Sequence, residues 1–391
     1  MSVFLDMSKA FDCVDHNILL HKMQLYGIKD KAFSWFSSYL SDRRQRVIFN
    51  DTLSDNICMV ECGVPQGSIL GPLLYLIYIN DINRCLKHCH VTLYADDTTL
   101  VATANNYEDL YRIINEDLSA LSDWLCLNKL TMNISKTKYI NYSLSQRTSL
   151  KENDFKVFLN GSIIERVDSF KFLGIYIDEH LTWKSHMHKI LSKIQRNLGV
   201  IRRVSCFLPK KALIQLFHSL ILSHIRYGII VWHHGQISLR KKIQACANKF
   251  LRMIFFMKRQ ESVKQLMIDN ELLSVNQIFN VEISKLMQRV ALDFIPSPFT
   301  DIFQNQERLS HITTRSSSNY YQPFMTTKKC QQSINYTGPF IWGSIPSDVK
   351  VPLTETDFDS AGPSMLSRNA RVVKSFTKRM KKYSLQSIDF I

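Results

Sequence analysis

Residues 90–102 read HVTLYADDTTLVA, in which two strand-forming segments flank a pair of acids. The β-branched and aromatic residues on either side favour strands, so this stretch predicts a hairpin whose turn carries Asp96 and Asp97. Residues 3–6 form another short apolar segment, which ends at Asp6. A strand there, lying beside the hairpin, would gather three carboxylates at one end of a sheet.

Around these strands, the first 183 residues alternate short apolar segments with amphipathic ones, which is the pattern of an α+β domain. The predicted strands are residues 3–6, 46–49, 57–61, 90–94 and 98–102, and the predicted helices are residues 15–26, 68–82 and 107–126. Asp15 stands at the N-cap position of the first helix. The apolar residues of the third helix recur with helical spacing, which predicts that it covers the sheet.

From residue 186 the pattern becomes helical, with charge of one sign only. The 75 residues 184–258 contain 15 Lys and Arg and no Asp or Glu, whereas the other 316 residues carry 34 of each sign. Opposite an apolar face, the first helix of this block carries the cations Lys189, Lys193, Arg196 and Arg203. Because like charges repel unless a polyanion lies nearby, we expect this block to bind nucleic acid.

A cluster of carboxylates and a basic surface serve one reaction together, the transfer of nucleotides. Two divalent ions about 3.5–4 Å apart hold the attacking and the leaving oxygen in an in-line displacement. Magnesium is held through few carboxylate ligands, which leaves room for substrate phosphates. Acids from separate strands, as predicted for Asp6, Asp96 and Asp97, suit such a site.

Three segments, in order, resemble the polymerase motifs of reverse transcriptases. FLDMSKAFD at residues 4–12 resembles the first motif and YADD at residues 94–97 the third. GVPQGSILGPLL at residues 63–74 resembles the second, in the form found in LINE-type elements of the jockey-like group. Downstream, NISKTK at residues 133–138 and FKFLGI at residues 170–175 are similar to segments of the same family. The resemblance covers about the first 260 residues and is to non-LTR retrotransposon reverse transcriptases.

This resemblance implies a right-hand polymerase fold and an RNA-directed DNA polymerase activity. The palm, with partial fingers, would occupy residues 1–183 as a ferredoxin-like antiparallel sheet with helices, followed by an all-helical basic thumb over residues 184–258 and a tail region over residues 259–391. The enzyme would use two Mg²⁺ ions, or Mn²⁺, to join a dNTP to a primer 3′-OH. Its partners would be an RNA template and a DNA primer or RNA–DNA duplex, with no membrane.

The resemblance also implies roles for single residues. Asp6 and Asp96 would ligate the metal ions, with Asp97 as a supporting acid. Lys136 matches a lysine that approaches the pyrophosphate leaving group, as charge stabiliser or proton donor, although a solvated surface lysine fits the sequence equally well. Phe11 matches the bulky position that excludes a ribose 2′-OH, and it also fits a core aromatic.

Two loops and a group of arginines complete the predicted site. The loop that lies against template and incoming nucleotide corresponds to Pro65, Gln66 and Gly67, whose alternative role is a turn that starts a helix. The primer grip, which without the resemblance is only a buried strand, corresponds to Phe172, Leu173 and Gly174. For Arg43, Arg44 and Arg46 we favour a solvated loop and strand edge over template contacts.

Two alternatives to an active polymerase stay open. Family members carry fingers before the first motif, whereas this chain begins within the strand of that motif, so we expect an N-terminally truncated element. After residue 260 we find no acidic nuclease cluster. A catalytically inactive retrotransposon-derived remnant that binds nucleic acid would have the same features. Another right-hand polymerase, such as a group II intron maturase or telomerase, is disfavoured by the second motif and by Phe11.

The nine cysteines are odd in number and scattered, which favours reduced thiols in an intracellular protein, nuclear or cytoplasmic. Cys58-x3-Cys62 and the group at residues 85–90 are weak candidates for structural zinc, because neither has paired spacing. The longest nearly apolar run, residues 69–79, is too short to cross a bilayer.

Overall fold

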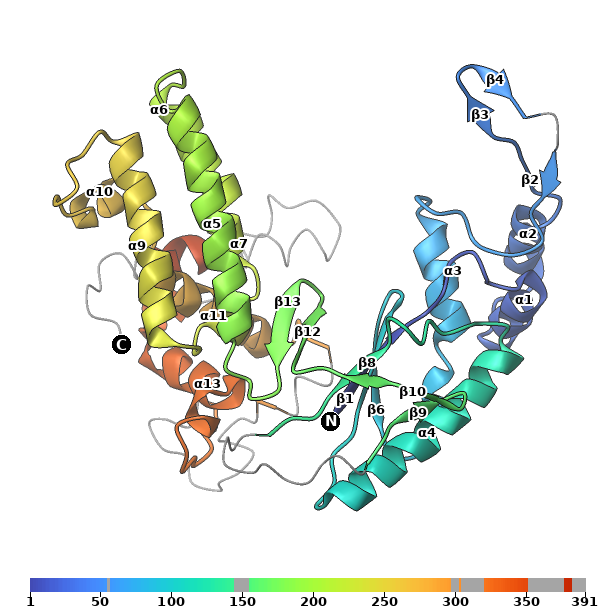
Figure 1. Ribbon diagram of the computed structural model, residues 1–391. Helices are drawn as coiled ribbons and strands as arrows, with labels where there is room; N and C mark the ends of the chain where they lie inside the picture. The colour runs from blue at the N-terminus through green and yellow to red at the C-terminus, as the bar shows by residue number, and fades with distance from the viewer. Residues whose placement is uncertain (55–56, 144–154, 297–301, 304–319, 351–375, 382–391) are drawn as a thin grey trace. The chain divides into compact units, whose positions relative to one another are not determined.

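The computed structural model describes residues 1–54, 57–143, 155–296, 302–303, 320–350 and 376–381 (Figure 1). The chain divides into two compact units, Met1–Leu181 and Thr182–Ile391. The first contains the sheet, and the second is helical in its described residues. The roles predicted for residues 1–183, 184–258 and 259–391 stay predictions.

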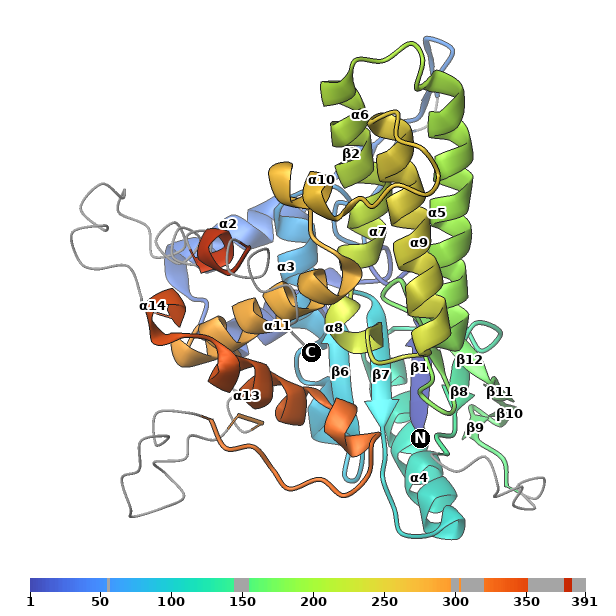
Figure 2. The same ribbon diagram turned by 90° about the vertical axis from the view of Figure 1, so that its left-hand side faces the viewer.

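The largest sheet of the first unit has five strands in the order β11-β8-β1-β7-β6 (Figure 2). The strands are β1 (Ser2–Asp6), β6 (His90–Tyr94), β7 (Asp97–Val101), β8 (Lys138–Ile140) and β11 (Glu165–Arg166). Neighbours run antiparallel except for β11, which is parallel to β8. The prediction of a wholly antiparallel sheet is therefore wrong at this edge. The physical reason is that β11 is reached by a crossover that contains the hairpin of β9 (Phe158–Leu159) and β10 (Ser162–Ile163).

The central strand β1 is buried on both faces, and successive side chains point to opposite sides. Val3 and Leu5 belong to the core formed with two helices, α3 (Leu70–Ile79) and α4 (Tyr107–Leu127). On the other face, the Phe4 ring stacks on Phe170 at 4.3 Å between centroids. Phe170 lies in the hairpin of β12 (Ser169–Phe172) and β13 (Ile175–Asp178), so β1 is held between a helical layer and a hairpin.

The helices of this unit follow the sequence pattern with one addition. Asp15 caps α1 (His16–Leu25) as predicted, because its Oδ1 accepts hydrogen bonds from the amides of Asn17 and Ile18, both at 3.0 Å. The predicted helix at residues 107–126 is α4, which lies along the sheet in Figure 1. Helix α2 (Asp30–Leu40) was not predicted. Its apolar residues Phe33, Phe36 and Leu40 recur with helical spacing, but only Leu40 is buried.

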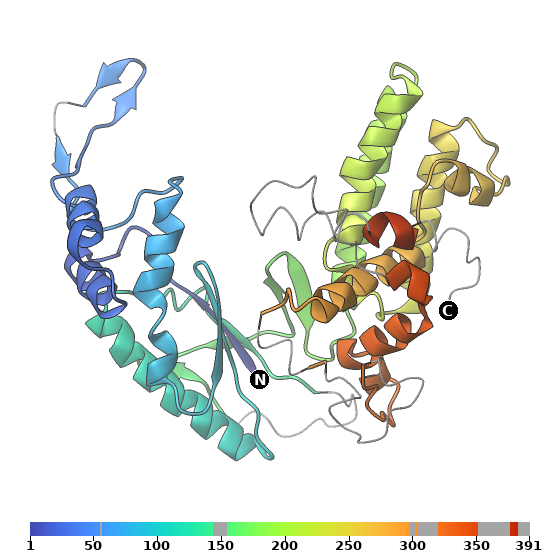
Figure 3. The same ribbon diagram turned by 180° about the vertical axis from the view of Figure 1, so that it is seen from behind.

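Four short strands lie between α2 and α3 and form an extended hairpin, seen projecting in Figures 1 and 3. They are β2 (Arg44–Gln45), β3 (Ile48–Phe49), β4 (Thr52–Leu53) and β5 (Cys58–Met59). β2 pairs with β5 and β3 pairs with β4. The predicted strands at residues 46–49 and 57–61 are thus shorter in the structure.

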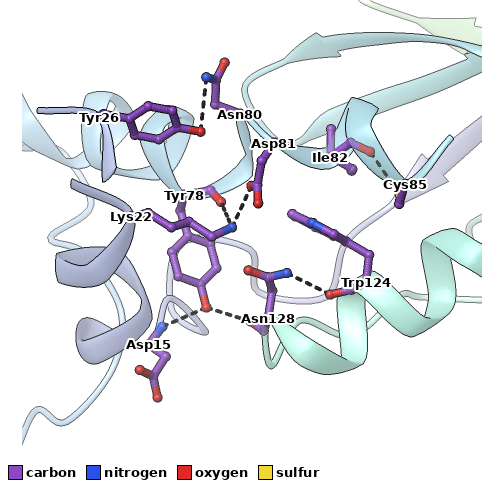
Figure 4. Close-up of polar contacts among 10 residues, drawn as sticks. All are labelled: Asp15, Lys22, Tyr26, Tyr78, Asn80, Asp81, Ile82, Cys85, Trp124 and Asn128. Atoms are coloured by element: carbon purple, nitrogen blue, oxygen red, sulfur yellow. Dashed lines mark hydrogen bonds and ion pairs between the residues drawn. The ribbon is translucent and has the colours of Figure 1, made fainter. Parts of the chain in front are cut away.

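A buried lysine joins three helices beneath the sheet (Figure 4). Lys22 of α1 is 8% exposed and donates from Nζ to the Tyr78 carbonyl oxygen at 2.6 Å and to Asp81 Oδ1 at 2.7 Å. Its ammonium also lies 4.8 Å from the centre of the Trp124 ring of α4. Burial lowers the pKa of Lys22, and the hydrogen bond and the charge of Asp81 oppose that shift. The Tyr78 hydroxyl donates to the Asn128 carbonyl at 2.6 Å, which fixes the end of α4.

The second unit has one hydrophobic core, built from residues between Met187 and Met380. Its helices are α5 (Lys184–Val204), α6 (Lys210–Phe217), the π-helical turn His218–Leu222, α7 (Ser223–Arg226), α8 (Ile229–Trp232), α9 (Ile237–Ile254), α10 (Lys264–Asp269), α11 (Val275–Ala291), α13 (Ile334–Ser344) and α14 (Ser347–Lys350), with a 3₁₀ turn at Cys330–Gln332. Figure 2 shows α11 and α13 side by side. Gly338 permits that close packing, because a Cβ there would lie 2.7 Å from Met287 Sδ. The residues after 259 therefore contribute to the same core as the basic helices.

No helix in the described ranges is long and apolar enough to cross a membrane.

We predict that Lys22→Met lowers the free energy of unfolding by roughly 2–3 kcal/mol. Methionine keeps the packing of the lysine stem but leaves the Asp81 carboxylate and the Tyr78 carbonyl without their donor. Urea unfolding of the whole chain measures the change. Lys31→Met, at an exposed position of α2, is the matched control, and equal stability of the two variants would contradict the prediction.

Candidate active site

The predicted acids come together at one end of the sheet. In the antiparallel pairing of β1 with β7, Asp6 lies directly opposite Asp97. Asp97 is also the partner of Tyr94 across the β6–β7 hairpin, which leaves Ala95 and Asp96 as a two-residue turn. Ala95 has a φ of +53°, and the two-residue turns that join antiparallel strands, types I′ and II′, require a positive φ at their first central residue. The hairpin turn predicted at these acids is therefore confirmed.

The electrostatics of this end of the sheet are those of an acidic cluster. The pKa of Asp97 is raised, first by burial, then by the negative charges of Asp96 and Asp6. The pKa of the Tyr75 hydroxyl in α3 is also raised, mainly by burial and further by the charge of Asp96. Negative charge is therefore in excess here, which is the condition that attracts a cation.

Lys136 lies next to this cluster, as the sequence suggested. Its Nζ is 3.6 Å from Asp6 Oδ2, and the two side chains are 69% and 40% exposed, so this ion pair contributes little to stability. The turn before β8 places the lysine, because the Asn133 amide donates to the Asp6 carbonyl oxygen at 2.8 Å. In return the Asp6 amide donates to Thr137 Oγ1 at 3.4 Å. The turn thus holds both backbone groups of Asp6.

The first and second motif segments contact each other through backbone and rings. The Val64 amide donates to the Phe11 carbonyl oxygen at 2.8 Å. The half-buried Phe11 ring lies 4.7 Å from the ring of Tyr75, between centroids. Phe11 is thus a core aromatic, one of the two roles considered for it, and its role towards a ribose stays a prediction. Gln66 Nε2 donates to Asp12 Oδ1 at 2.8 Å, which links the two segments by side chains as well.

The loop from Pro65 to Ile69 precedes the helix α3. Gly67 has a φ of +80°, and the Ser68 hydroxyl donates to the Pro65 carbonyl oxygen at 2.8 Å. A Cβ on Gly71 would lie 2.4 Å from that same oxygen, so only glycine fits this close turn. Because the loop occupies these residues, the helix begins at Leu70, two residues later than predicted.

The predicted primer-grip residues form the turn of the β12–β13 hairpin. Phe172 lies opposite Ile175, and between them Leu173 and Gly174 have φ values of +45° and +82°. Two left-handed residues in a two-residue loop define a type I′ turn. The Phe172 ring lies 5.5 Å from that of Phe4, two residues before Asp6 in the chain. The hairpin is therefore anchored close to the acidic cluster.

The predicted phosphate-binding cations lie on an exposed helix face. Lys189, Lys193, Arg196 and Arg203 are all exposed on α5. Apolar residues on its other face, among them Ile190, Ile194 and Ile201, are buried in the core of the second unit. The amphipathic arrangement is as predicted, and the nucleic-acid contacts stay predictions. Of the three arginines considered between residues 43 and 46, Arg43 and Arg44 line a cavity and Arg46 does not.

Three contributors to this site were not singled out from the sequence, namely Asp12, Asn133 and Thr137. All three lie inside segments that the resemblance covers, so their position in those segments was the available signal. Their hydrogen bonds run between segments far apart in the chain, which no local pattern reveals.

Among the residues that the structure describes, neither zinc candidate lies in a group of three or more His, Cys, Asp or Glu that could hold a metal ion. The Asp117 carboxylate instead accepts hydrogen bonds from the amides of Lys87, His88 and Cys89 at 2.7–3.0 Å. These amides hold the pKa of Asp117 below its usual value despite its burial. Within residues 85–90, the amides of residues 87–89 thus form a loop that is hydrogen-bonded to Asp117 of α4.

The acidic cluster suits magnesium in its donor chemistry, because it offers only carboxylate oxygens. Asp6 and Asp97 are adjacent across the ladder, and the pKa of Asp97 is raised by its burial and further by the charges of Asp96 and Asp6. Among the described residues, however, no group of three or more His, Cys, Asp or Glu is already arranged to hold a metal ion. The site thus has the ligand types but not a preformed three-ligand cage.

Sequence comparison identifies the class of protein to which the first unit is related. Residues 1–177 match the family described as "Reverse transcriptase (RNA-dependent DNA polymerase)", and the chain contains a reverse transcriptase domain of that family. More particularly, the domain is related to those of the jockey, X-element and BS non-LTR retrotransposons, at about 28% identity.

Two relatives from Drosophila melanogaster illustrate the relation. The "Probable RNA-directed DNA polymerase from transposon BS" is 29% identical over 271 residues, and the "RNA-directed DNA polymerase from mobile element jockey" is 28% identical over 269 residues. Each match covers 65% of this chain and 28% of the relative, so the chain spans little more than a quarter of these proteins. A solved structure of telomerase from Candida albicans with a fragment of telomeric RNA is 14% identical, with a TM-score of 0.34 over 71% of this chain and 48% of that one. A likeness at that level says nothing about function.

We predict that Asp97 titrates above the ordinary aspartate value of about 3.9 and that Asp96→Asn moves its pKa part of the way back. The return is partial because burial, the larger cause, remains. As the pH falls, the folded chain binds this proton before the unfolded chain, so protonation of Asp97 stabilises the fold. NMR titration of the labelled carboxyl carbons measures both effects. Asp123→Asn, at an exposed position of α4, should leave Asp97 unchanged, and an Asp97 that titrates normally would refute the acidic cluster.

Proposed function

We propose that this chain is the RNA-directed DNA polymerase part of a non-LTR retrotransposon and extends a primer 3′-OH with dNTPs on an RNA template. The observation that carries the proposal is the register of β1 and β7, which sets Asp6 against Asp97 with Asp96 in the adjoining turn. In this proposal the first unit is a palm with partial fingers and the basic helices of the second are a thumb.

The three acids would hold two divalent ions, Mg²⁺ or Mn²⁺. Bound there, the ions supply a clamp on the attacking and leaving oxygens of an in-line displacement. Asp6 and Asp96 are the direct ligands in this scheme and Asp97 supports them. The negative excess at Asp97 favours cation binding, and a bound cation would in turn keep Asp97 ionised.

In this proposal Lys136 acts on the phosphates of the incoming nucleotide. Its ammonium already lies at the edge of the acidic cluster, 3.6 Å from Asp6. Both partners are largely exposed, so the lysine exchanges this contact at little cost for a more highly charged triphosphate. There it would stabilise the negative charge of the leaving pyrophosphate or deliver a proton to it.

Phe11, the loop from Pro65 to Gly67 and the hairpin at Phe172 would surround the nucleotide and the primer end. Phe11 is fixed by Tyr75 and by Val64, so it could present a rigid edge to a sugar. The exposed cations of α5 would contact the phosphates of the product duplex without reading its sequence.

Primer extension on an RNA template with Mg²⁺ tests this function. We predict that the chain extends the primer with dNTPs and that Asp96→Asn lowers the rate at least about a hundredfold, the scale on which lost transition-state charge stabilisation acts. Asp123→Asn controls for the loss of one negative charge and should keep full activity.

Two other outcomes would overturn the proposal. Duplex binding without extension at any Mg²⁺ or Mn²⁺ concentration would favour an inactive remnant that retains nucleic-acid binding. A preference for ribonucleotides over deoxyribonucleotides would exclude a reverse transcriptase.

We further predict that Thr137→Val lowers the turnover number about tenfold with little change in the KM for dNTP, whereas Thr137→Ser retains activity. The hydroxyl is fully buried, accepts a hydrogen bond from the Asp6 amide at 3.4 Å and donates one to the Asn133 carbonyl oxygen at 2.9 Å. Its loss therefore removes two hydrogen bonds, each worth about 1 kcal/mol, that hold the backbone of a proposed metal ligand in the turn. Valine keeps the volume, and serine keeps the hydroxyl. A purely structural role would instead lower the unfolding midpoint of both variants and spare the ratio of kcat to KM in the folded fraction.

A further inference from the structure

The positive charge of Lys136 lies against the acidic cluster, at an oxygen that a metal ion would also need. Its Nζ is 3.6 Å from Asp6 Oδ2. Within the described ranges of the chain, no other ion pair involves Asp6, Asp96 or Asp97. In the proposed function Asp6 is a direct metal ligand, so the lysine and the metal ion require the same carboxylate.

The backbone of Lys136 is held beside Asp6, but its side chain is held only weakly. The Asn133 amide donates to the Asp6 carbonyl oxygen at 2.8 Å, and the Lys136 amide donates to the Asn133 carbonyl oxygen at 3.2 Å. These two bonds fix the lysine backbone near Asp6. The side chains of the ion pair are 69% and 40% exposed, so the pair is weak. The ammonium therefore stays close to Asp6 and exchanges readily.

The Lys136 ammonium opposes the binding of a second cation at Asp6. It neutralises part of the charge of the carboxylate and repels a divalent ion that approaches the same oxygen. The acids do not compensate for this with a preformed cage, because no group of three or more His, Cys, Asp or Glu in the part of the chain that the structure describes could hold a metal ion. Magnesium held by few protein ligands depends on water and substrate phosphates for the others.

The triphosphate of a nucleotide changes this balance in two ways. Its oxygens supply ligands that the acidic cluster lacks. They also carry more negative charge than one carboxylate, so they attract the ammonium of Lys136 away from Asp6. The Asp6 carboxylate is then available to the metal ion without a competing cation.

We propose that Lys136 couples metal binding to the arrival of the nucleotide, because its ammonium competes for Asp6 until the phosphates draw it away. The inference rests on the proposed polymerase function and adds an order of events to it. A metal ion held beside RNA without a nucleotide can activate water as a nucleophile, and the competition limits that side reaction. The first test requires metal binding alone.

Electron paramagnetic resonance of free Mn²⁺ measures metal binding by the whole chain without nucleotide. We expect Lys136→Met to bind Mn²⁺ about fivefold more tightly than the wild type, the effect of one unit charge about 4 Å away in water. Methionine is also unbranched and flexible, but it carries no charge. Lys136→Arg keeps the charge and should bind Mn²⁺ as the wild type does.

Lys138→Met is the matched control, two residues further along the chain. Lys138 pairs with Glu165 at 2.5 Å and not with the acidic cluster. Its replacement removes the same charge from the same segment, so a general effect of net charge would appear in both variants. Equal Mn²⁺ affinity of the wild type and Lys136→Met would overturn the inference, and so would an equal gain in Lys138→Met.

A double-mutant cycle tests whether the competition takes place at Asp6. Asp6→Asn removes the negative partner of Lys136. Adding Lys136→Met to Asp6→Asn should therefore increase Mn²⁺ affinity by a smaller factor than it does in the wild type. An undiminished increase would show that the lysine acts without Asp6, which contradicts the competition.

The coupling to the nucleotide is measured from the nucleotide side. By reciprocity, the factor by which a nucleotide raises metal affinity equals the factor by which the metal raises nucleotide affinity. Binding of dNTP to the chain on a duplex with a dideoxy-terminated primer, which blocks extension, is measured at several fixed concentrations of free Mn²⁺. Formation of the Mn²⁺–dNTP complex in solution is the same for both chains and cancels in the comparison. The factor should be about fivefold larger for the wild type than for Lys136→Met, and equal factors would contradict the coupling.

These measurements separate the inference from the polymerase proposal. Tighter Mn²⁺ binding by Lys136→Met, in a chain that extends no primer, would support the competition and contradict the polymerase function. Primer extension by a chain whose Mn²⁺ affinity does not depend on Lys136 would support the polymerase function and refute the competition.

Discussion

The antiparallel pairing of β1 with β7 is the constraint on which the rest of the first unit depends. A shift of one residue would reverse the two faces of β1 and move Asp6 away from Asp97. The same register buries Val3 and Leu5 on one side and stacks Phe4 on the other. Burial of each such side chain contributes about 1.5–3 kcal/mol, whereas two charges in contact with water at about 4 Å interact by only about 1 kcal/mol. Hydrophobic packing therefore outweighs the repulsion between the acids and determines where they lie.

The other segments of the site are attached to the few residues that follow this strand. The turn from Asn133 to Thr137 holds the backbone of Asp6, and the backbone of Val64 is bonded to Phe11. Gly63 lies so close to the backbone of Asp12 that an added Cβ would be 2.9 Å from its carbonyl oxygen. A displacement of β1 would therefore move Lys136, Gln66 and Phe11 together. The distances among these three residues would then change little.

Features with a local signal were predictable from the sequence, and those that depend on distant contacts were not. The cap at Asp15, the hairpin turn at Asp96 and the apolar face of α4 each follow from neighbouring residues and agree with the structure. Strand β11 was not predicted, and the expected antiparallel sheet is wrong there, because strand direction is set by the crossover before it and not by the strand's own residues. The hydrogen bond between Asp12 and Gln66 joins residues 54 positions apart, so its partners could be named only once the fold was known.

The close contact of Gly338 with Met287 affects where the second unit can be shortened without exposing its core. The two helices that meet there, α11 and α13, lie after residue 259, yet they share one core with α5 and α9. Ending the chain at the last basic helix would uncover the apolar faces of α9 and its neighbours to water. A shortened chain made for laboratory use would then tend to aggregate, whatever its activity. A chain designed to contain the basic helices should therefore also include α11 and α13, because these helices complete the same hydrophobic core.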